Sequence, residues 1–186
     1  MRLTESKAPE VRVENQLVRF SHAEPVDQEV ALSKLSGKRS GDYILIQLQI
    51  PRATIIIDSR GRIIVHGTKR LQIARSAAKE VLLRMGRVDD GLSTEMGPVQ
   101  ASFQFSRGLN LDGIEDALYP ANVVRDSRLD CVRIEDRRHE MELLLWENGK
   151  AVALGATHAN LVAMSAVYWR SKIDEAGLFD SSVGGD

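Results

Sequence analysis

The clearest pattern in the chain is a set of apolar runs that changes period in the first half. β-Branched residues fill positions 54–57 and 63–65, and a short segment around Gly61 separates the two runs. Two such runs around a glycine-containing loop predict a β-hairpin. From Lys69 onward, apolar residues recur at intervals of three and four residues. This change predicts an amphipathic helix that ends near Gly86.

The same order of patterns returns in the second half. Apolar runs at 143–146 and 151–154 surround a turn, and a helical pattern follows over about 159–173. The glycines that end the corresponding segments recur at one interval of 88 positions, from Gly61 to Gly149 and from Gly67 to Gly155. The sequence therefore predicts two copies of one unit, at residues 11–86 and 99–175. A linker at 87–98 and flexible tails at 1–10 and 178–186 complete this prediction.

The other segments extend each copy in the same order. Alternation and turn residues predict, for the first copy, a strand at 11–20, a short helix at 26–35, a loop at 36–41 and a strand at 43–50. The second copy repeats this with a strand at 99–105, a short helix at 111–118, a loop at 119–129, and strands at 130–134 and 141–146. A match of residues 19–22 with residues 104–107 supports the alignment. The expected fold class is α+β, with an antiparallel sheet whose helices cover one face and leave the other free.

Composition narrows the class of protein. The chain is 43% hydrophobic and 27% charged, which is typical of a globular protein. No apolar run approaches the roughly 20 residues that span a bilayer, and the N-terminus lacks the pattern of a secretory signal, so no membrane partner is expected. A single cysteine, Cys131, excludes a disulfide framework and favours a reducing compartment. The histidines show no ligand spacing, and no metal or cofactor is expected.

The net charge of −1 conceals an asymmetry between the halves. Residues 1–98 carry 16 basic and 12 acidic side chains, whereas residues 99–186 carry 9 basic and 14 acidic ones. This distribution is consistent with an orienting field for a partner or a polyanion. It is equally consistent with two solvent-exposed surfaces that carry different numbers of acidic and basic side chains.

The first hairpin resembles that of the TATA-box-binding protein family. The resemblance lies in Pro51-Arg52, the 54–57 strand, Arg60-Gly61-Arg62, the 63–65 strand and the segment His66-Gly67-Thr68-Lys69. The second copy agrees through Asn148-Gly149-Lys150 and Gly155-Ala156. The resemblance implies two pseudo-symmetric repeats that form one curved antiparallel sheet, a saddle with helices on its convex face. The concave face of that family binds the DNA minor groove, for which the family is a well-known example.

The resemblance also implies a set of DNA-binding residues. The groove-facing residues would be Ile56, Asp58, Ile64, His66, Leu129, Leu144, Trp146, Val152 and Leu154. The phosphate-binding residues would be Arg52, Arg62, Lys69 and Lys150. The family inserts two phenylalanines per repeat between bases, and this chain has Asp58 and Gly41 at those places in the first copy and Trp146 and Leu129 in the second. Neither repeat keeps the family's asparagine that contacts the central base pairs.

These features lead to a hypothesis of function. The chain would be a general transcription initiation factor that binds double-stranded promoter DNA and recruits partners such as factors similar to IIA and IIB. It would be nuclear, or cytoplasmic in an archaeon, and the free protein would form a dimer. The alternative is a scaffold that has lost independent DNA binding and holds other proteins in a transcription complex. An enzyme is not expected; an acid–base pair of Asp58 and His66 across the hairpin is a third hypothesis, for which a surface salt bridge is the simpler explanation.

Overall fold

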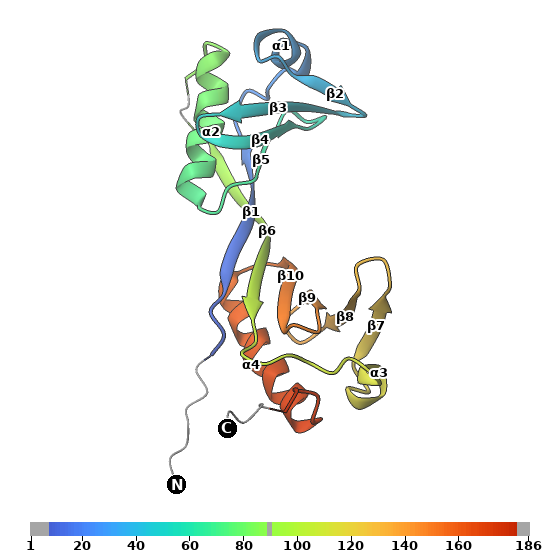
Figure 1. Cartoon of the computed structure of the whole chain (residues 1–186). Coiled ribbons are helices and arrows are strands. Elements are labelled where there is room, and N and C mark those ends of the chain that lie inside the picture. Colours follow the sequence, from blue (N-terminus) through green and yellow to red (C-terminus); the bar gives the residue numbers. More distant parts are fainter. Residues whose placement is uncertain (1–7, 89–90, 182–186) are drawn as a thin grey trace. The chain divides into compact units, whose positions relative to one another are not determined.

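Both halves of the chain contain the same order of elements. The computed structural model describes residues 8–88 and 91–181. The first half contains β1 (Arg12–Ser21), α1 (Gln28–Lys34), β2 (Lys38–Ser40), β3 (Tyr43–Gln49), β4 (Arg52–Ile57), β5 (Ile63–His66) and α2 (Leu71–Arg84). The second half contains β6 (Ser93–Gln104), α3 (Ile114–Ala117), β7 (Asn122–Asp126), β8 (Cys131–Asp136), β9 (Met141–Leu145), β10 (Lys150–Ala156) and α4 (Ala159–Glu175) (Figure 1). The predicted duplication is therefore confirmed at the level of secondary structure.

The strand order repeats as well. Hydrogen bonding gives the order β2-β3-β4-β5-β1 in the first half and β6-β10-β9-β8-β7 in the second. The pairings within each half are antiparallel, and the two predicted central hairpins form as β4–β5 and β9–β10. This confirms the α+β class and the antiparallel sheet.

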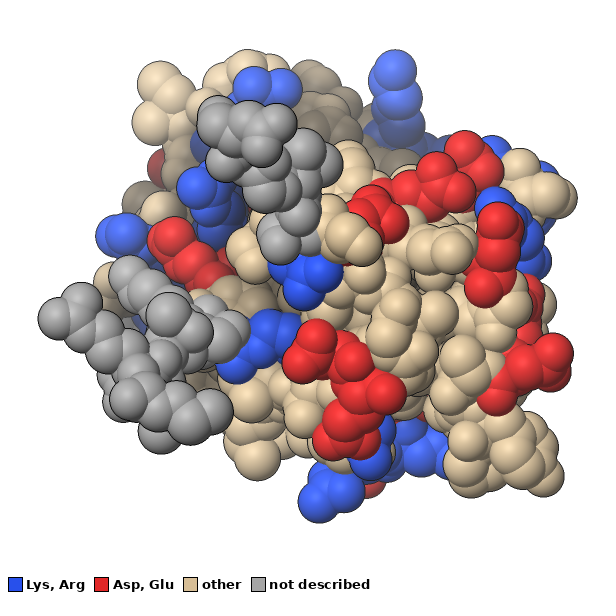
Figure 2. Space-filling model, turned by 60° about the horizontal axis from the view of Figure 1, so that its bottom comes forward, with Lys and Arg blue, Asp and Glu red and all other residues tan. Residues whose placement is uncertain are grey.

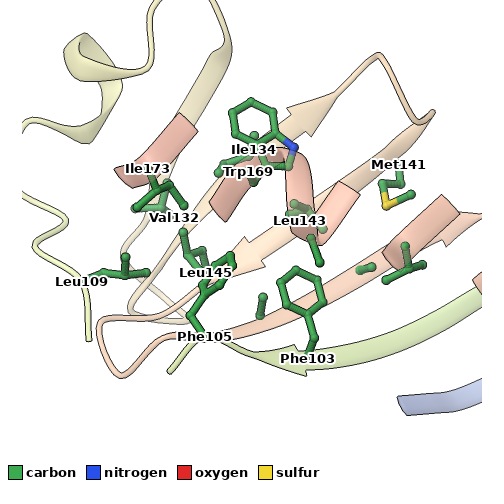
Figure 3. Packing of buried hydrophobic residues seen from close by; sticks show 14 of the residues in the cluster. Phe103, Phe105, Leu109, Val132, Ile134, Met141, Leu143, Leu145, Trp169 and Ile173 are labelled. Carbon is green, nitrogen blue, oxygen red and sulfur yellow. The ribbon is translucent and has the colours of Figure 1, made fainter. Parts of the chain in front are cut away.

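Each half has its own hydrophobic core. The first repeat unit comprises Glu14–Pro98, and the second comprises the chain from Val99 together with the segment up to Val13. In the first unit, alternate residues of β4 and β5 are buried against the alanines of α2, as the helical period predicted. In the second unit, Trp169 and Ile173 of α4 meet Phe103, Phe105 and Leu143 of the sheet (Figure 3). Because the described helices contribute to these cores from one side, none of them covers the other face of either sheet half.

Three local predictions were wrong. The expected loops at 36–41 and 119–129 contain the strands β2 and β7, which pair with β3 and β8. The residues of β2 are all exposed, so this strand is held by hydrogen bonds to its neighbour and shows no apolar pattern of its own. Strand β6 begins at Ser93, inside the predicted linker, and residues 89–90 of that linker lie outside the described residues.

The C-terminal segment is also more ordered than predicted. Leu178 is buried, and the ring of Phe179 packs edge-on against Phe105 at 5.6 Å between centroids. The backbone N–H of Asp180 donates a hydrogen bond to the carbonyl of Gly108 at 2.9 Å. A flexible tail from 178 is therefore wrong for these residues, because two aromatic side chains give the segment a packing partner. Residues 1–7 and 182–186 of the predicted tails lie outside the described residues.

The strand pairings correct the alignment of the first strands of the two copies. Phe20 lies opposite Ile63, and Phe103 lies opposite Ala151, which is the position that corresponds to Ile63 in the second copy. Phe20 therefore corresponds to Phe103, two residues before the match with Phe105 that the sequence suggested. Two phenylalanines on the same face of one strand made both alignments plausible.

Candidate nucleic-acid interface

An apolar strip crosses the helix-free face of the first repeat unit. Leu45, Ile56 and Ile64 lie side by side on β3, β4 and β5, and Arg19 of β1 continues the row. The three apolar side chains are half-buried, whereas their neighbours along each strand are fully buried in the core. The alternation of the strands thus places Ile56 and Ile64 on the open face, as the sequence predicted.

Basic side chains flank this strip. Lys38 lies opposite Leu45 on the edge strand β2, and Arg52 lies opposite Gln49 at the start of β4. Both are exposed, and within residues 8–88 and 91–181 neither has a carboxylate at ion-pair distance. Lys69 is exposed as well, with Glu14 at 3.9 Å. Lys38 was not identified from the sequence, because the segment that carries it was expected to be a loop.

The structure assigns Asp58 and Arg62 to the hairpin turn. Asp58 is only 4% exposed, and its carboxylate accepts hydrogen bonds from the backbone N–H groups of Arg60 and Arg62 and, at 2.6 Å, from Arg62 Nε. Burial alone would raise the pKa of Asp58, but these hydrogen bonds outweigh it and the pKa is lowered. Asp58 is therefore not an open-face carboxylate, and the Arg62 side chain is committed to it.

The predicted contact between Asp58 and His66 does not form. The register pairs His66 with Thr54, while Asp58 is bonded to Arg62 at the opposite end of β5. His66 is exposed on the open face, next to the apolar strip. The hairpin thus contains no acid–base pair of these two residues.

The helix-free face of the second unit has a row of the same design but different chemistry. One residue from each strand contributes to this row, in the order β7, β8, β9, β10 and β6: Val124, Arg133, Leu144, Val152 and Ser102. Val124 is exposed, Val152 is half-buried and Leu144 is buried by its neighbours. In the next row, the half-buried Leu154 lies opposite Glu142. The apolar surface that the sequence predicted here is interrupted by charged side chains.

Trp146 and Leu129 are brought together in the second unit. The indole Nε1 of Trp146 donates a hydrogen bond of 3.0 Å to the carbonyl of Leu129 in the β7–β8 turn. Leu129 is 46% exposed and Trp146 is half-buried. Lys150 is exposed close by, opposite Gln104. The indole of Trp146 therefore lies against the turn that carries the exposed Leu129, and these two residues are here called the apolar corner.

A ladder of charges crosses β7, β8 and β9. Arg133 donates to Asp126 through Nε at 2.8 Å and also bonds Glu142 on the next strand. The hydrogen bond from Arg133, with those from Arg128 and Leu129, lowers the pKa of Asp126 to about 2. Sequence reasoning missed this ladder, although charged residues alternate with apolar ones along β8. Because these charges are paired with one another, this part of the face has only a weak electrostatic attraction for a polyanion.

A second polar cluster lies beneath α4. Asp136 is 1% exposed, and its Oδ2 accepts hydrogen bonds from Ser165 Oγ at 2.5 Å, His139 Nδ1 at 2.8 Å and Trp169 Nε1 at 2.9 Å. Burial alone would raise the pKa of Asp136, but the hydrogen bonds from Ser165, Trp169 and His139 prevail and the pKa is lowered. This cluster fastens α4 to the end of β8.

Other chemistry is sparse in the described residues. Cys131 is buried, and burial raises the pKa of its thiol, which makes it unreactive. No group of three or more histidine, cysteine, aspartate or glutamate side chains in the described chain is placed to hold a metal ion. None of the described helices is long and apolar enough to cross a membrane. Figure 2, which brings the lower part of Figure 1 forward, shows acidic side chains in separate groups divided by uncharged surface.

Comparison with solved structures identifies the fold. The chain is similar to the structure titled Methanococcus jannaschii TBP, with a TM-score of 0.79 and 17% sequence identity over 90% of this chain and 99% of that one. The chain therefore has the fold of a TATA-box-binding protein. A heterotetrameric sarcosine oxidase from Corynebacterium sp. U-96, in complex with pyrrole 2-carboxylate, gives a TM-score of 0.36 and 6% identity over 94% of this chain and 87% of that one, which supports no shared fold. No family model and no curated protein matches the sequence.

Proposed function

We propose that this protein acts in transcription initiation by binding duplex DNA, chiefly through the helix-free face of the first repeat unit. One observation carries this proposal. The apolar strip of Leu45, Ile56 and Ile64 is flanked by Lys38 and Arg52, which have no ion-pair partner in the described residues. Apolar side chains suit the sugars and base edges of a minor groove, and free cations suit the phosphates beside it. The fold itself is consistent with a transcription-related role.

The second unit has an apolar corner of its own that suits duplex DNA. Trp146 and Leu129 would press against the duplex, and Lys150 would contact the adjacent phosphates. In the first unit, Asp58 is tied into a turn and offers no wedge. Unstacking a base step costs a few kcal/mol, and a protein with one wedge site offsets less of that cost than one with several. We therefore expect weak binding by the protein alone and stronger binding with partners similar to factors IIA and IIB.

Fluorescence anisotropy of labelled duplexes tests the proposal. AT-rich and GC-rich duplexes would be titrated with the protein, with and without such partners, across a range of salt concentrations. The double variant Lys38→Glu/Arg52→Glu should bind less tightly, and the slope of log K against log salt should fall by about 2, because each phosphate contact contributes about 0.9. Trp146→Ala should weaken binding without changing that slope.

A charge-reversal control distinguishes this face from the helical one. Arg84→Glu reverses one charge on α2, as each half of the double variant does on the sheet, and its side chain is paired with Glu80 in solvent. This variant should bind as tightly as the wild type. The proposal is wrong if no duplex binds even with partners present, or if Arg84→Glu weakens binding as much as the double variant.

A protein-interaction scaffold is the second candidate function. The ladder of Asp126, Arg133 and Glu142 favours it, because these side chains neutralise one another on the face that would otherwise approach phosphates. On this alternative, partners should stay bound in affinity purification at high salt and after nuclease treatment. A promoter footprint that disappears when this protein is omitted would refute it.

A further inference from the structure

A cavity of about 570 Å³ opens on the second repeat unit, where β8 ends. Its walls come from the α3–β7 connection, the end of β8 and the last turns of α4. The volume lies in the range of sites that bind small molecules or the side chains of a peptide. Nothing in the proposed DNA interface uses this cavity.

Two cations meet at one aromatic ring on the rim of the cavity. The guanidinium of Arg138 lies 5.0 Å from the centroid of the Tyr168 ring, and Lys172 Nζ lies 5.8 Å from it. Arg138 is exposed, and no carboxylate in the described part of the chain lies at ion-pair distance from it. Each cation is attracted to the ring, so an anion beside the ring would be attracted by both cations.

The acidic side chains of the cavity are already engaged. Asp136 accepts from Ser165, Trp169 and His139 beneath the floor. Glu135 accepts from Asn122 and Arg137 at one wall, and Glu175 lies 3.6 Å from Lys172 in solvent. The positive charge of Arg138 is therefore the one on the rim without a compensating partner among the described residues.

The cavity also presents apolar surface. Tyr119 is 82% exposed at its mouth, followed by Pro120, and the alanines Ala117, Ala121 and Ala176 line the walls. An exposed tyrosine beside small residues leaves room for an apolar side chain of a ligand. Cationic side chains and apolar surface thus lie within one cavity.

We propose that this cavity binds an acidic segment of a partner protein, in which an apolar side chain is flanked by carboxylates. The carboxylates would contact Arg138 and Lys172, and the apolar side chain would lie against Tyr119. Residues 99–186 carry 9 basic and 14 acidic side chains, so an acidic ligand is repelled by most of this unit. The cationic rim is then a local exception that selects where such a segment docks.

The test uses the full chain and a short synthetic peptide with one phenylalanine between glutamates. A peptide with glutamines in place of the glutamates is the control ligand. Binding would be followed by NMR through the two tryptophan indole N–H signals, which Trp146→Phe assigns. The acidic peptide should shift the signal of Trp169, which lines the cavity, and leave that of Trp146 unchanged. Duplex DNA should do the reverse, so this proposal and the proposed function fail separately.

Charge reversal of the rim measures its contribution. Arg138→Glu/Lys172→Glu should weaken acidic-peptide binding at least about fivefold, the effect expected of two partly exposed cations. Arg128→Glu makes the same kind of change at an exposed residue outside the cavity and should leave the affinity unchanged. Equal binding by the glutamine peptide, equal binding by the double variant, or no shift of the Trp169 signal would each overturn the proposal.

Discussion

Replacing Asp136 by asparagine removes one negative charge from the cluster beneath α4 at almost constant volume. In the wild type, Oδ2 accepts from three side-chain donors and Oδ1 accepts from the backbone N–H of His139 at 3.0 Å. An amide has one accepting oxygen, so its NH₂ group must face a donor on one side or the other. Asp136→Asn therefore leaves at least one buried donor without an acceptor and converts the remaining bonds into neutral ones.

The expected loss of stability follows from these contacts. Three hydrogen bonds that change from charged to neutral lose about 1 kcal/mol each, and one unsatisfied buried donor costs about 1–3 kcal/mol. The amide avoids the desolvation of a carboxylate, which offsets part of this loss. We expect a net destabilisation of about 3 kcal/mol. With a denaturant slope of about 2 kcal/mol per molar urea, the unfolding midpoint should fall by about 1.5 M.

Urea unfolding of Trp146→Phe proteins, followed by the fluorescence of Trp169, measures this change in the unit that contains the cluster. Glu135→Gln is the matched control, because it makes the same chemical change one residue earlier on the solvent side of the same strand. It should leave the midpoint close to that of the wild type. A midpoint shift for Asp136→Asn of less than about 0.5 M would refute the reasoning.

The effect of Asp136→Asn also depends on pH. Because the pKa of Asp136 is lowered in the folded protein, its stabilising effect is complete above the unfolded pKa of about 3.9. That effect is lost as the pH falls through the lower folded pKa, so the difference between wild type and variant should shrink below about pH 4. A difference that stays constant into this range would contradict the assigned role of the charge.

Two further predictions concern the glycines of the hairpin turns and the charge ladder. Gly61 has φ +74°, and an added Cβ would lie 2.7 Å from the backbone of Val26, so Gly61→Ala should cost about 3 kcal/mol in thermal unfolding. Gly67→Ala has a similar backbone strain but no atom within 4 Å, so it should cost about 1 kcal/mol; equal losses would show that the contact is unimportant. The Asp126 carboxyl should titrate with a midpoint of about 2 by NMR, and Arg133→Ala should raise it; a wild-type midpoint near 4 would contradict the ladder.

The local patterns of the sequence determined the main elements of this protein. The apolar period of two gave the central hairpins, and the period of three to four gave α2 and α4, because each period places side chains on one face whatever lies opposite. The recurrent glycines also predicted the duplication. Gly61 and Gly149 have φ +74° and +83°, and Gly67 and Gly155 have +92° and +82°, so the corresponding turns require the same left-handed backbone.

Tertiary structure decided which partners these elements and side chains have. Strands β2 and β7 exist because a neighbouring strand supplies their hydrogen bonds, so no apolar pattern marked them. Alternation placed Asp58 on the open face, but the chain after β4 folds its carboxylate back onto Arg62.

The two copies show this division most clearly at Asp136. The corresponding place in the first copy is filled by the buried Leu48, and the place of Ser165 is filled by Ala77. The predicted strand ends at 134, so the sequence assigns no core position to Asp136, whereas in the structure β8 extends to Asp136 and buries it. Only the packed structure decides whether the core there is apolar or polar, because a buried carboxylate is stable only where several donors converge on it from distant segments.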